Sequence, residues 1–132
     1  MRPTPDINFS NAALPKKGTI IVLCDKELTF TAALADWSVL PTINKALKAA
    51  DFKGGFAEVL DVLTPEGSDL DRVKVIGLGD EGKLNEYSWL RLGGKIMSKL
   101  NSKDRALIYV ERPSGESVKA SEAVDLALGM KL

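Results

Sequence analysis

The sequence predicts an α/β fold, a sandwich in which helices cover a mixed, mostly parallel sheet, and two observations support this. After residue 18, short β-branched apolar runs alternate with longer segments of helical period, a pattern typical of parallel strands packed between helices. The chain has 132 residues, of which 45% are hydrophobic and 27% charged, as in a soluble globular protein. No repeat, low-complexity tract or linker interrupts it. We therefore expect a single domain over residues 1–132.

Apolar runs of four to eight residues mark the expected strands. The strongest is residues 19–24, a continuous apolar and β-branched run that predicts a strand covered on both faces. Residues 73–78 and 105–110 have the same character, and residues 56–63 partly alternate apolar with polar side chains. Residues 7–9 predict a weaker first strand.

Segments of helical period predict three helices. We expect Asp36 to cap a helix that runs to about Ala50, and Asn85 to cap a helix over residues 86–100. The last helix is expected to start between Ser117 and Ser121 and to run to the C-terminus. The expected buried stripes are Trp37, Leu40, Ile43 and Leu47 in the first helix and Trp89, Gly93, Ile96 and Leu100 in the second.

Glycines in the second and third helices predict how these helices pack. Gly93 and Gly94 each weaken a helix by about 1 kcal/mol relative to alanine, so we expect another backbone to approach there. The last helix is apolar around most of its circumference, which predicts cover on both sides. Two interpretations follow. Either Gly129 ends this helix near a natural terminus, or the sequence is part of a longer protein, which is the interpretation we favour.

Composition excludes much catalytic chemistry. The sequence has no histidine, which excludes Ser-His-Asp and Cys-His catalysis and histidine zinc sites. Its one cysteine, Cys24, excludes an internal disulfide, and its apolar surroundings predict a buried structural thiol in a cytoplasmic protein. Eighteen basic residues balance eighteen acidic ones, so nucleic acid is not a favoured partner. The longest apolar runs are about six residues, far below the roughly 20 that a membrane helix needs.

Three groups of residues qualify as candidate sites, and we favour a structural interpretation for each. Gly77–Asp80 follows a strand as phosphate-binding turns do, but it lacks the third glycine of the dinucleotide motif. The carboxylates Asp69, Asp71, Asp80 and Glu81 do not have the spacing of a calcium loop. The short lysine groups at residues 16–17 and 45–48 lack interleaved aromatic residues. We assign no catalytic, cofactor-binding or metal-binding residue.

Five stretches, taken in order, carry a resemblance to a known family. They are Gly-Thr-Ile-Ile-Val-Leu at 18–23, Phe-Lys-Gly-Gly-Phe-Ala-Glu-Val-Leu-Asp-Val-Leu at 52–63, Arg-Val-Lys-Val-Ile-Gly-Leu-Gly at 72–79, Trp-Leu-Arg-Leu-Gly-Gly-Lys-Ile at 89–96 and Ala-Val-Asp-Leu-Ala-Leu-Gly at 123–129. Together they resemble the N-terminal domain of the leucyl aminopeptidase (cytosol aminopeptidase) family. The resemblance covers the chain from about residue 5 to its end and implies a fold like the macro domain.

The resemblance also implies a function for a longer parent protein. Such a parent is a cytoplasmic homo-hexamer that releases N-terminal residues from peptides with two divalent metals, zinc or manganese. Its catalytic machinery lies in a C-terminal domain whose characteristic motifs are not in this sequence. We therefore expect no cofactor and no catalysis in this chain. Two alternatives stay open: a macro-like module that binds ADP-ribose or a nucleotide through the Gly77–Asp80 loop, and a nucleic-acid-binding surface.

Overall fold

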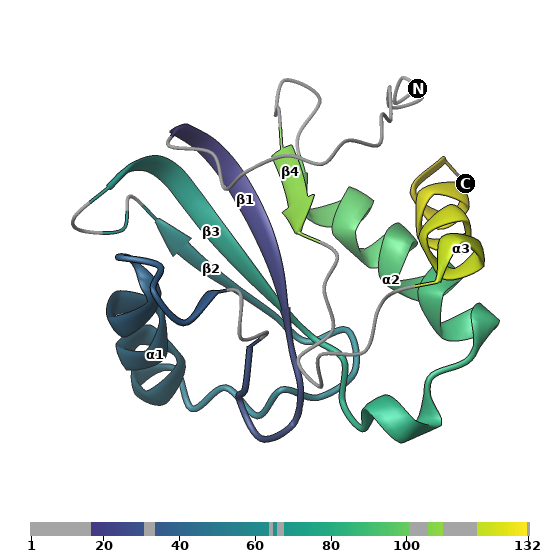
Figure 1. Ribbon diagram of the computed structural model, residues 1–132, viewed down its shortest axis with the longest axis horizontal. Helices are drawn as coiled ribbons and strands as arrows, with labels where there is room; N and C mark the ends of the chain where they lie inside the picture. Colours follow the sequence, from purple (N-terminus) through teal and green to yellow (C-terminus); the bar gives the residue numbers. More distant parts are fainter. Residues whose placement is uncertain are drawn as a thin grey trace.

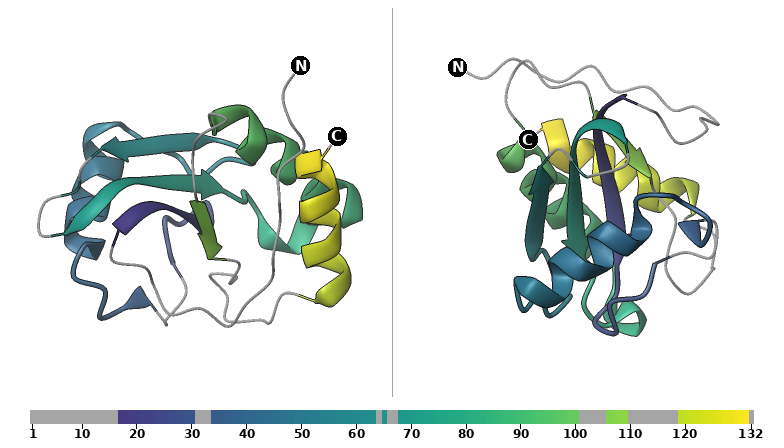
Figure 2. Two further views of the ribbon diagram at one scale, coloured as in Figure 1. Left: turned by 90° about the horizontal axis from the view of Figure 1, so that it is seen from above. Right: turned by 90° about the vertical axis from the view of Figure 1, so that its left-hand side faces the viewer.

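A computed structural model describes residues 17–30, 34–63, 65, 68–100, 106–109 and 119–131. In these ranges a four-stranded sheet separates helix α1 on one face from helices α2 and α3 on the other (Figure 1). When the left-hand side of the molecule faces the viewer, α1 lies in front of the strands and α3 behind them (Figure 2). The strands are β1 (Lys17–Cys24), β2 (Val59–Leu63), β3 (Asp69–Gly77) and β4 (Ala106–Tyr109), and the helices are α1 (Leu40–Ala49), α2 (Glu86–Lys99) and α3 (Ala120–Lys131).

The sheet is mixed and mostly parallel, with the strand order β2-β3-β1-β4. The central strand β1 pairs in parallel with both β3 and β4. Strand β2 pairs antiparallel with β3, because the connection between these two strands is too short for a crossover. The predicted α/β class and mixed sheet are therefore confirmed. The strand predicted over residues 7–9 lies outside the described residues.

Alternate side chains of the sheet enter two separate cores. On the α1 side, Ile20, Val22 and Cys24 of β1 pack with Ile43 and Leu47 of α1. On the opposite side, Ile21 and Leu23 of the same strand pack with buried residues of the other two helices, which are Trp89, Leu92, Ile96, Leu126 and Met130. This arrangement confirms that β1 is covered on both faces, as its unbroken apolar run predicts.

The start of α1 differs from the expectation. Helix α1 begins at Leu40, its N-cap position is Val39, and no side chain caps it. Asp36 is exposed and lies in a turn ahead of the helix. Tight turns precede the helix, because the Trp37 N–H donates to the Leu34 carbonyl and the Leu40 N–H donates to the Trp37 carbonyl, each at 3.0 Å. The prediction of an Asp36 cap was therefore wrong.

The boundaries of two strands also differ from those expected. Strand β2 starts at Val59 rather than at residue 56, because Phe56 and Ala57 form a turn. Ala57 has a φ of 62°, which is incompatible with a strand. Strand β3 starts earlier than expected, at Asp69, where its pairing with β1 begins at Lys17.

The start of α2 is confirmed at Asn85. The Asn85 Oδ1 accepts from the Ser88 N–H at 3.0 Å, and the Ser88 Oγ accepts from the Asn85 N–H at 3.2 Å. This reciprocal capping box satisfies two backbone donors that the helix itself leaves unpaired. Helix α2 ends at Lys99, one residue before the predicted end.

Helices α2 and α3 pack backbone to backbone through two glycines. A Cβ atom added at Gly93 would overlap the carbonyl oxygen of Leu126, and one added at Gly129 would overlap the carbonyl oxygen of Leu90. The close approach predicted at Gly93 is confirmed, whereas Gly94 is exposed and a Cβ there would lie 3.8 Å from the Gly129 oxygen. Because α3 continues to Lys131, the interpretation that Gly129 ends the helix is wrong.

No helix in the described ranges has the length and apolar character needed to cross a membrane.

Candidate functional site

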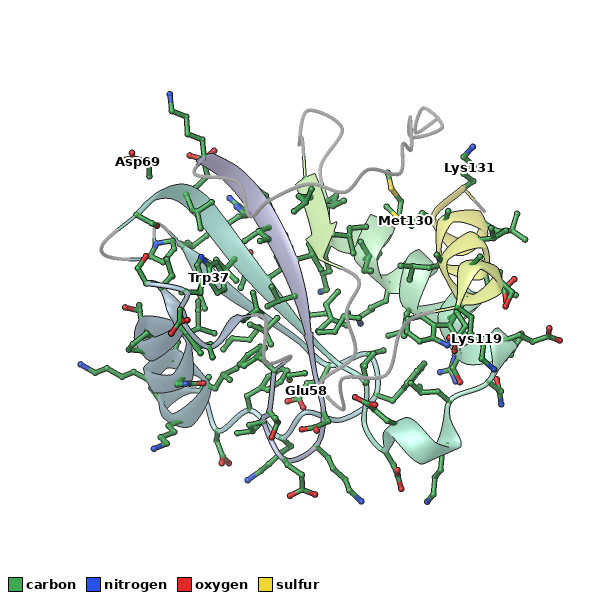
Figure 3. The ribbon with its side chains drawn as sticks, in the orientation of Figure 1. Trp37, Glu58, Asp69, Lys119, Met130 and Lys131 are labelled. Carbon is green, nitrogen blue, oxygen red and sulfur yellow. The ribbon has the colours of Figure 1, made fainter. Side chains whose placement is uncertain are left out.

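The carboxyl ends of β1 and β3 are the natural place to look for a ligand site in this fold. These strands are adjacent and parallel, and the chain leaves them toward opposite faces of the sheet, after β1 to α1 and after β3 to α2. In open α/β sheets, ligands bind in the crevice that such a divergence creates. The predicted Gly77–Asp80 loop lies here, and so does the labelled Glu58 (Figure 3).

This crevice is filled by the chain itself. Residues 54–58 pass so close to the end of β3 that a Cβ atom at Gly77 would overlap the carbonyl oxygen of Gly55. The backbone of Gly54 comes equally close to the residue that follows β1, because a Cβ atom there would overlap the carbonyl oxygen of Asp25. Glycine at these positions therefore lets three backbone segments meet without intervening side chains.

The loop after β3 donates its N–H groups to its protein neighbours. The N–H groups of Gly77, Leu78 and Gly79 donate to the carbonyls of Glu58 (2.8 Å), Cys24 (2.8 Å) and Gly54 (2.9 Å), respectively. A phosphate-binding loop needs such donors to be free. Asp80 then caps the short 3-10 helix Glu81–Lys83 by accepting from the Gly82 N–H at 3.0 Å. The geometry thus favours the structural interpretation of Gly77–Asp80 over nucleotide binding.

Two carboxylates that the sequence analysis did not single out hold the neighbouring loops. The Oδ1 atom of Asp25 accepts from the N–H groups of Glu27 and Thr29, both at 3.0 Å. The Oε1 atom of Glu58 accepts from the N–H groups of Gly55 at 3.0 Å and Lys53 at 3.2 Å. An aspartate at the end of a strand is a typical turn former, so Asp25 was predictable, whereas the role of Glu58 depends on the tertiary fold.

The structure does not bring the four candidate metal-binding carboxylates together. Asp69 and Asp71 lie at the start of β3, while Asp80 and Glu81 follow its end. A nine-residue strand spans about 30 Å at roughly 3.3 Å per residue. Within the described ranges, no three Asp, Glu, Cys or His side chains are grouped so as to hold a metal ion.

The described basic residues include exposed lysines and one buried lysine, whose carboxylate partner is 37% exposed. Lys45 and Lys48 are exposed on α1, and Lys16 lies outside the described residues. Lys74 is only 3% exposed, and its Nζ donates to the Asp61 Oδ2 at 3.1 Å. Because a buried ammonium group needs a partner, this pair is explained by the fold, and the sequence analysis did not anticipate it.

Cys24 is buried at the end of β1, as predicted. Burial raises the pKa of its thiol from the ordinary value of 9.0 to about 12, and the nearby carboxylates of Asp25 and Glu58 contribute in the same direction. Only a thiolate is strongly nucleophilic, so this thiol is inert at neutral pH.

We expect Cys24 to make the fold sensitive to alkaline pH. Above the ordinary thiol pKa of 9.0 the unfolded chain loses a proton that the folded chain keeps up to about pH 12. The free energy of unfolding therefore falls as pH rises through this window, with a contribution of up to about 1.4 kcal/mol per pH unit. Urea unfolding at several pH values should show this slope, and Cys24→Ala should reduce it. An equal slope in the variant would contradict this account of the thiol.

The comparisons with known proteins decide the family. A family model described as the cytosol aminopeptidase family, N-terminal domain, matches residues 20–132. The chain belongs to this family.

Three relatives of this chain are several times longer than it is. This chain is 36% identical over 129 residues to a probable cytosol aminopeptidase of Rhodopseudomonas palustris. The alignment covers 96% of this chain and 26% of the relative. The corresponding proteins of Agrobacterium fabrum and Chelativorans sp. are 37% and 36% identical and cover 96% and 100% of this chain. The chain thus spans about a quarter of the length of the curated relatives that it matches.

A solved structure supports the fold of the family domain. A mutant form of tomato leucine aminopeptidase aligns with 93% of this chain and 28% of its own, at a TM-score of 0.57 and 16% sequence identity. At this identity the comparison concerns the fold alone. It confirms that the α/β architecture is that of the N-terminal region of a leucine aminopeptidase.

Proposed function

We propose that this chain is the non-catalytic N-terminal domain of an aminopeptidase whose full-length form releases N-terminal amino acids, leucine among them, from peptides. The observation that carries the proposal is the pairing of a family match over residues 20–132 with relatives of which the chain covers only 26%. In these relatives, most of the polypeptide, and with it the room for a peptidase centre, lies outside the matched region.

The chemistry of the described residues supports the proposal that the peptidase centre lies outside this domain. A two-metal peptidase centre needs several clustered carboxylates, and the described part of the chain has no cluster that fits such metals. The one cysteine is buried with a raised pKa, which makes it unsuitable as a nucleophile. We assign the two divalent metals, zinc or manganese, to the remainder of the full-length protein and derive no catalytic step from this domain.

The domain's own role in the proposal is to support assembly or regulation of the parent enzyme. Two cores close the sheet on both sides, and the segment 54–58 fills the crevice where a ligand would bind in a related fold. A domain whose crevice is filled in this way is suited to contact other parts of an assembly. We propose that the parent is a homo-hexamer of the cytoplasm.

Peptidase assays on two proteins test the proposal. The purified 132-residue chain and the full-length protein are incubated with a leucyl peptide, with manganese or zinc and with a chelator. We expect metal-dependent release of leucine from the full-length protein alone. Metal-dependent release by the pure 132-residue chain, or no release by the full-length protein with either metal, would contradict the proposal.

A further inference from the structure

The outer face of α3 carries an apolar ridge that the described fold does not cover. Val124 is 57% exposed and Leu128 is 48% exposed. They lie four positions apart, on the same face of the helix. Leu126 lies between them in sequence, on the opposite side of the helix, and is 3% exposed. Helix α3 therefore presents apolar side chains both inward and outward.

The inner face of α3 cannot turn to bury this ridge. Gly129 brings the backbone of α3 against the carbonyl of Leu90 in α2, and Gly93 brings α2 against the carbonyl of Leu126. Rotation of α3 would place larger side chains where only glycine fits. The helix lies at the outside of the molecule, packed mainly on α2 (Figures 1 and 2). Movement of α3 within the described fold therefore does not supply cover for Val124 and Leu128.

We propose that the Val124–Leu128 ridge docks onto the remainder of the full-length polypeptide, the part that carries the peptidase centre. This inference rests on the proposed function. The ridge is then an internal contact between two domains of one chain, and the occupant is an apolar patch on the larger domain.

The relatives favour the rest of the polypeptide over a second copy of this domain as the occupant of the ridge. The family match runs to residue 132 and is to an N-terminal domain, and the relatives are about four times longer. Because the matched domain is the N-terminal one and is about a quarter of the relative, most of the relative's polypeptide follows the segment equivalent to α3. A tethered partner has a high effective concentration and needs little contact area. Separate molecules need about 1,200 Å² or more, which two side chains do not supply.

Cysteine labelling measures whether the ridge is covered. We compare full-length proteins carrying Leu128→Cys or the matched control Asn44→Cys, which is on the exposed face of α1, and follow maleimide labelling of each site by peptide mass spectrometry. Native Cys24 is buried and does not interfere. We expect Leu128→Cys to react on the order of tenfold more slowly than the control, because a docked domain blocks access. Equal rates would overturn the proposal.

Photo-crosslinking identifies what covers the ridge. Photo-leucine is incorporated into the full-length protein, and cross-links from position 128 are mapped, with those from buried Leu126 as an internal positive control. We expect position 128 to cross-link to a peptide beyond residue 132 in a product with the mass of one chain. A product with the mass of two chains would assign the ridge to a second copy and overturn the proposal.

The experiments distinguish a failure of the proposed function from a failure of the docking inference alone. If the native protein has the mass of this chain alone, the proposed function fails and the docking inference fails with it. If a full-length, metal-dependent peptidase exists but position 128 is freely labelled or cross-links between chains, the docking inference alone fails.

Discussion

Gly93→Ala is expected to lower the free energy of unfolding by about 2 kcal/mol, the balance of an overpacking cost of about 3 kcal/mol at a closed interface and a smaller gain in helix propensity. The added methyl group would overlap the backbone carbonyl of Leu126, and backbone atoms of a packed helix have no rotamer through which to yield. The gain in helix propensity, about 1 kcal/mol, offsets only part of this cost. Urea unfolding followed by circular dichroism measures the change.

The neighbouring glycine provides the matched control. Gly94 is exposed, and a Cβ there would meet its nearest neighbour at 3.8 Å, which is ordinary van der Waals contact. Gly94→Ala should therefore raise the free energy of unfolding by up to about 1 kcal/mol through helix propensity alone. If both variants were stabilised equally, the close α2–α3 contact would be absent in solution.

Trp89→Ala is expected to lower the free energy of unfolding by about 4 kcal/mol, since Phe or Trp to Ala changes in cores cost roughly 3–5 kcal/mol. Trp89 is 0% exposed and lies in the core between the sheet and the α2–α3 pair. Its Nε1 has no hydrogen-bond acceptor in the described part of the chain. Trp89→Phe removes this buried donor along with some volume, so it should cost clearly less than Trp89→Ala.

Tyr87→Ala is the matched control for this aromatic position. Tyr87 is on the same helix and is 66% exposed, so its truncation should change the free energy of unfolding by no more than about 0.5 kcal/mol. Both variants are measured by denaturant unfolding in the same buffer. A loss below 1 kcal/mol for Trp89→Ala would mean that this helix does not close the second core.

The sequence predicted those parts of the fold that depend on local pattern. The unbroken apolar run of residues 19–24 predicted that β1 is covered on both faces, and Asn85 predicted the start of α2. The prediction that Asp36 caps the first helix was wrong. Aspartate is a common N-cap residue, but tight turns at and after Asp36 delay the start of the helix to Leu40. Residue type alone does not fix a helix start when the chain before it forms tight turns.

The tertiary contacts at the sheet's carboxyl edge were less accessible to sequence analysis. The prediction that Gly77–Asp80 follows a strand is confirmed, whereas the sequence does not indicate where Gly54 and Gly55 lie relative to it. That these two segments meet and fill the crevice depends on their close approach in space. Likewise, the Lys74–Asp61 pair joins residues 13 positions apart, and the local sequence around either residue does not predict the pairing.

The family match affects how the exposed apolar face of α3 is interpreted. In an isolated domain its apolar outer face would stay in contact with water, which is unfavourable. Such a face usually marks a contact with another protein surface. The relatives are about four times longer, and in the longer polypeptide that we propose, the same face would suit a contact between two domains. Leu128 and Gly129 thus lie on different sides of α3, with Gly129 facing α2 inside the domain and Leu128 exposed.

The central claim, that this chain is one domain of a larger aminopeptidase, is tested most directly by the intact mass of the native protein. An antibody raised against the 132-residue chain is used to purify the protein from its source cells, and the mass is measured by mass spectrometry under denaturing conditions. We predict a single polypeptide of about four times 14.2 kDa, as the 26% coverage of the relatives implies. A native polypeptide of 14.2 kDa would contradict the claim.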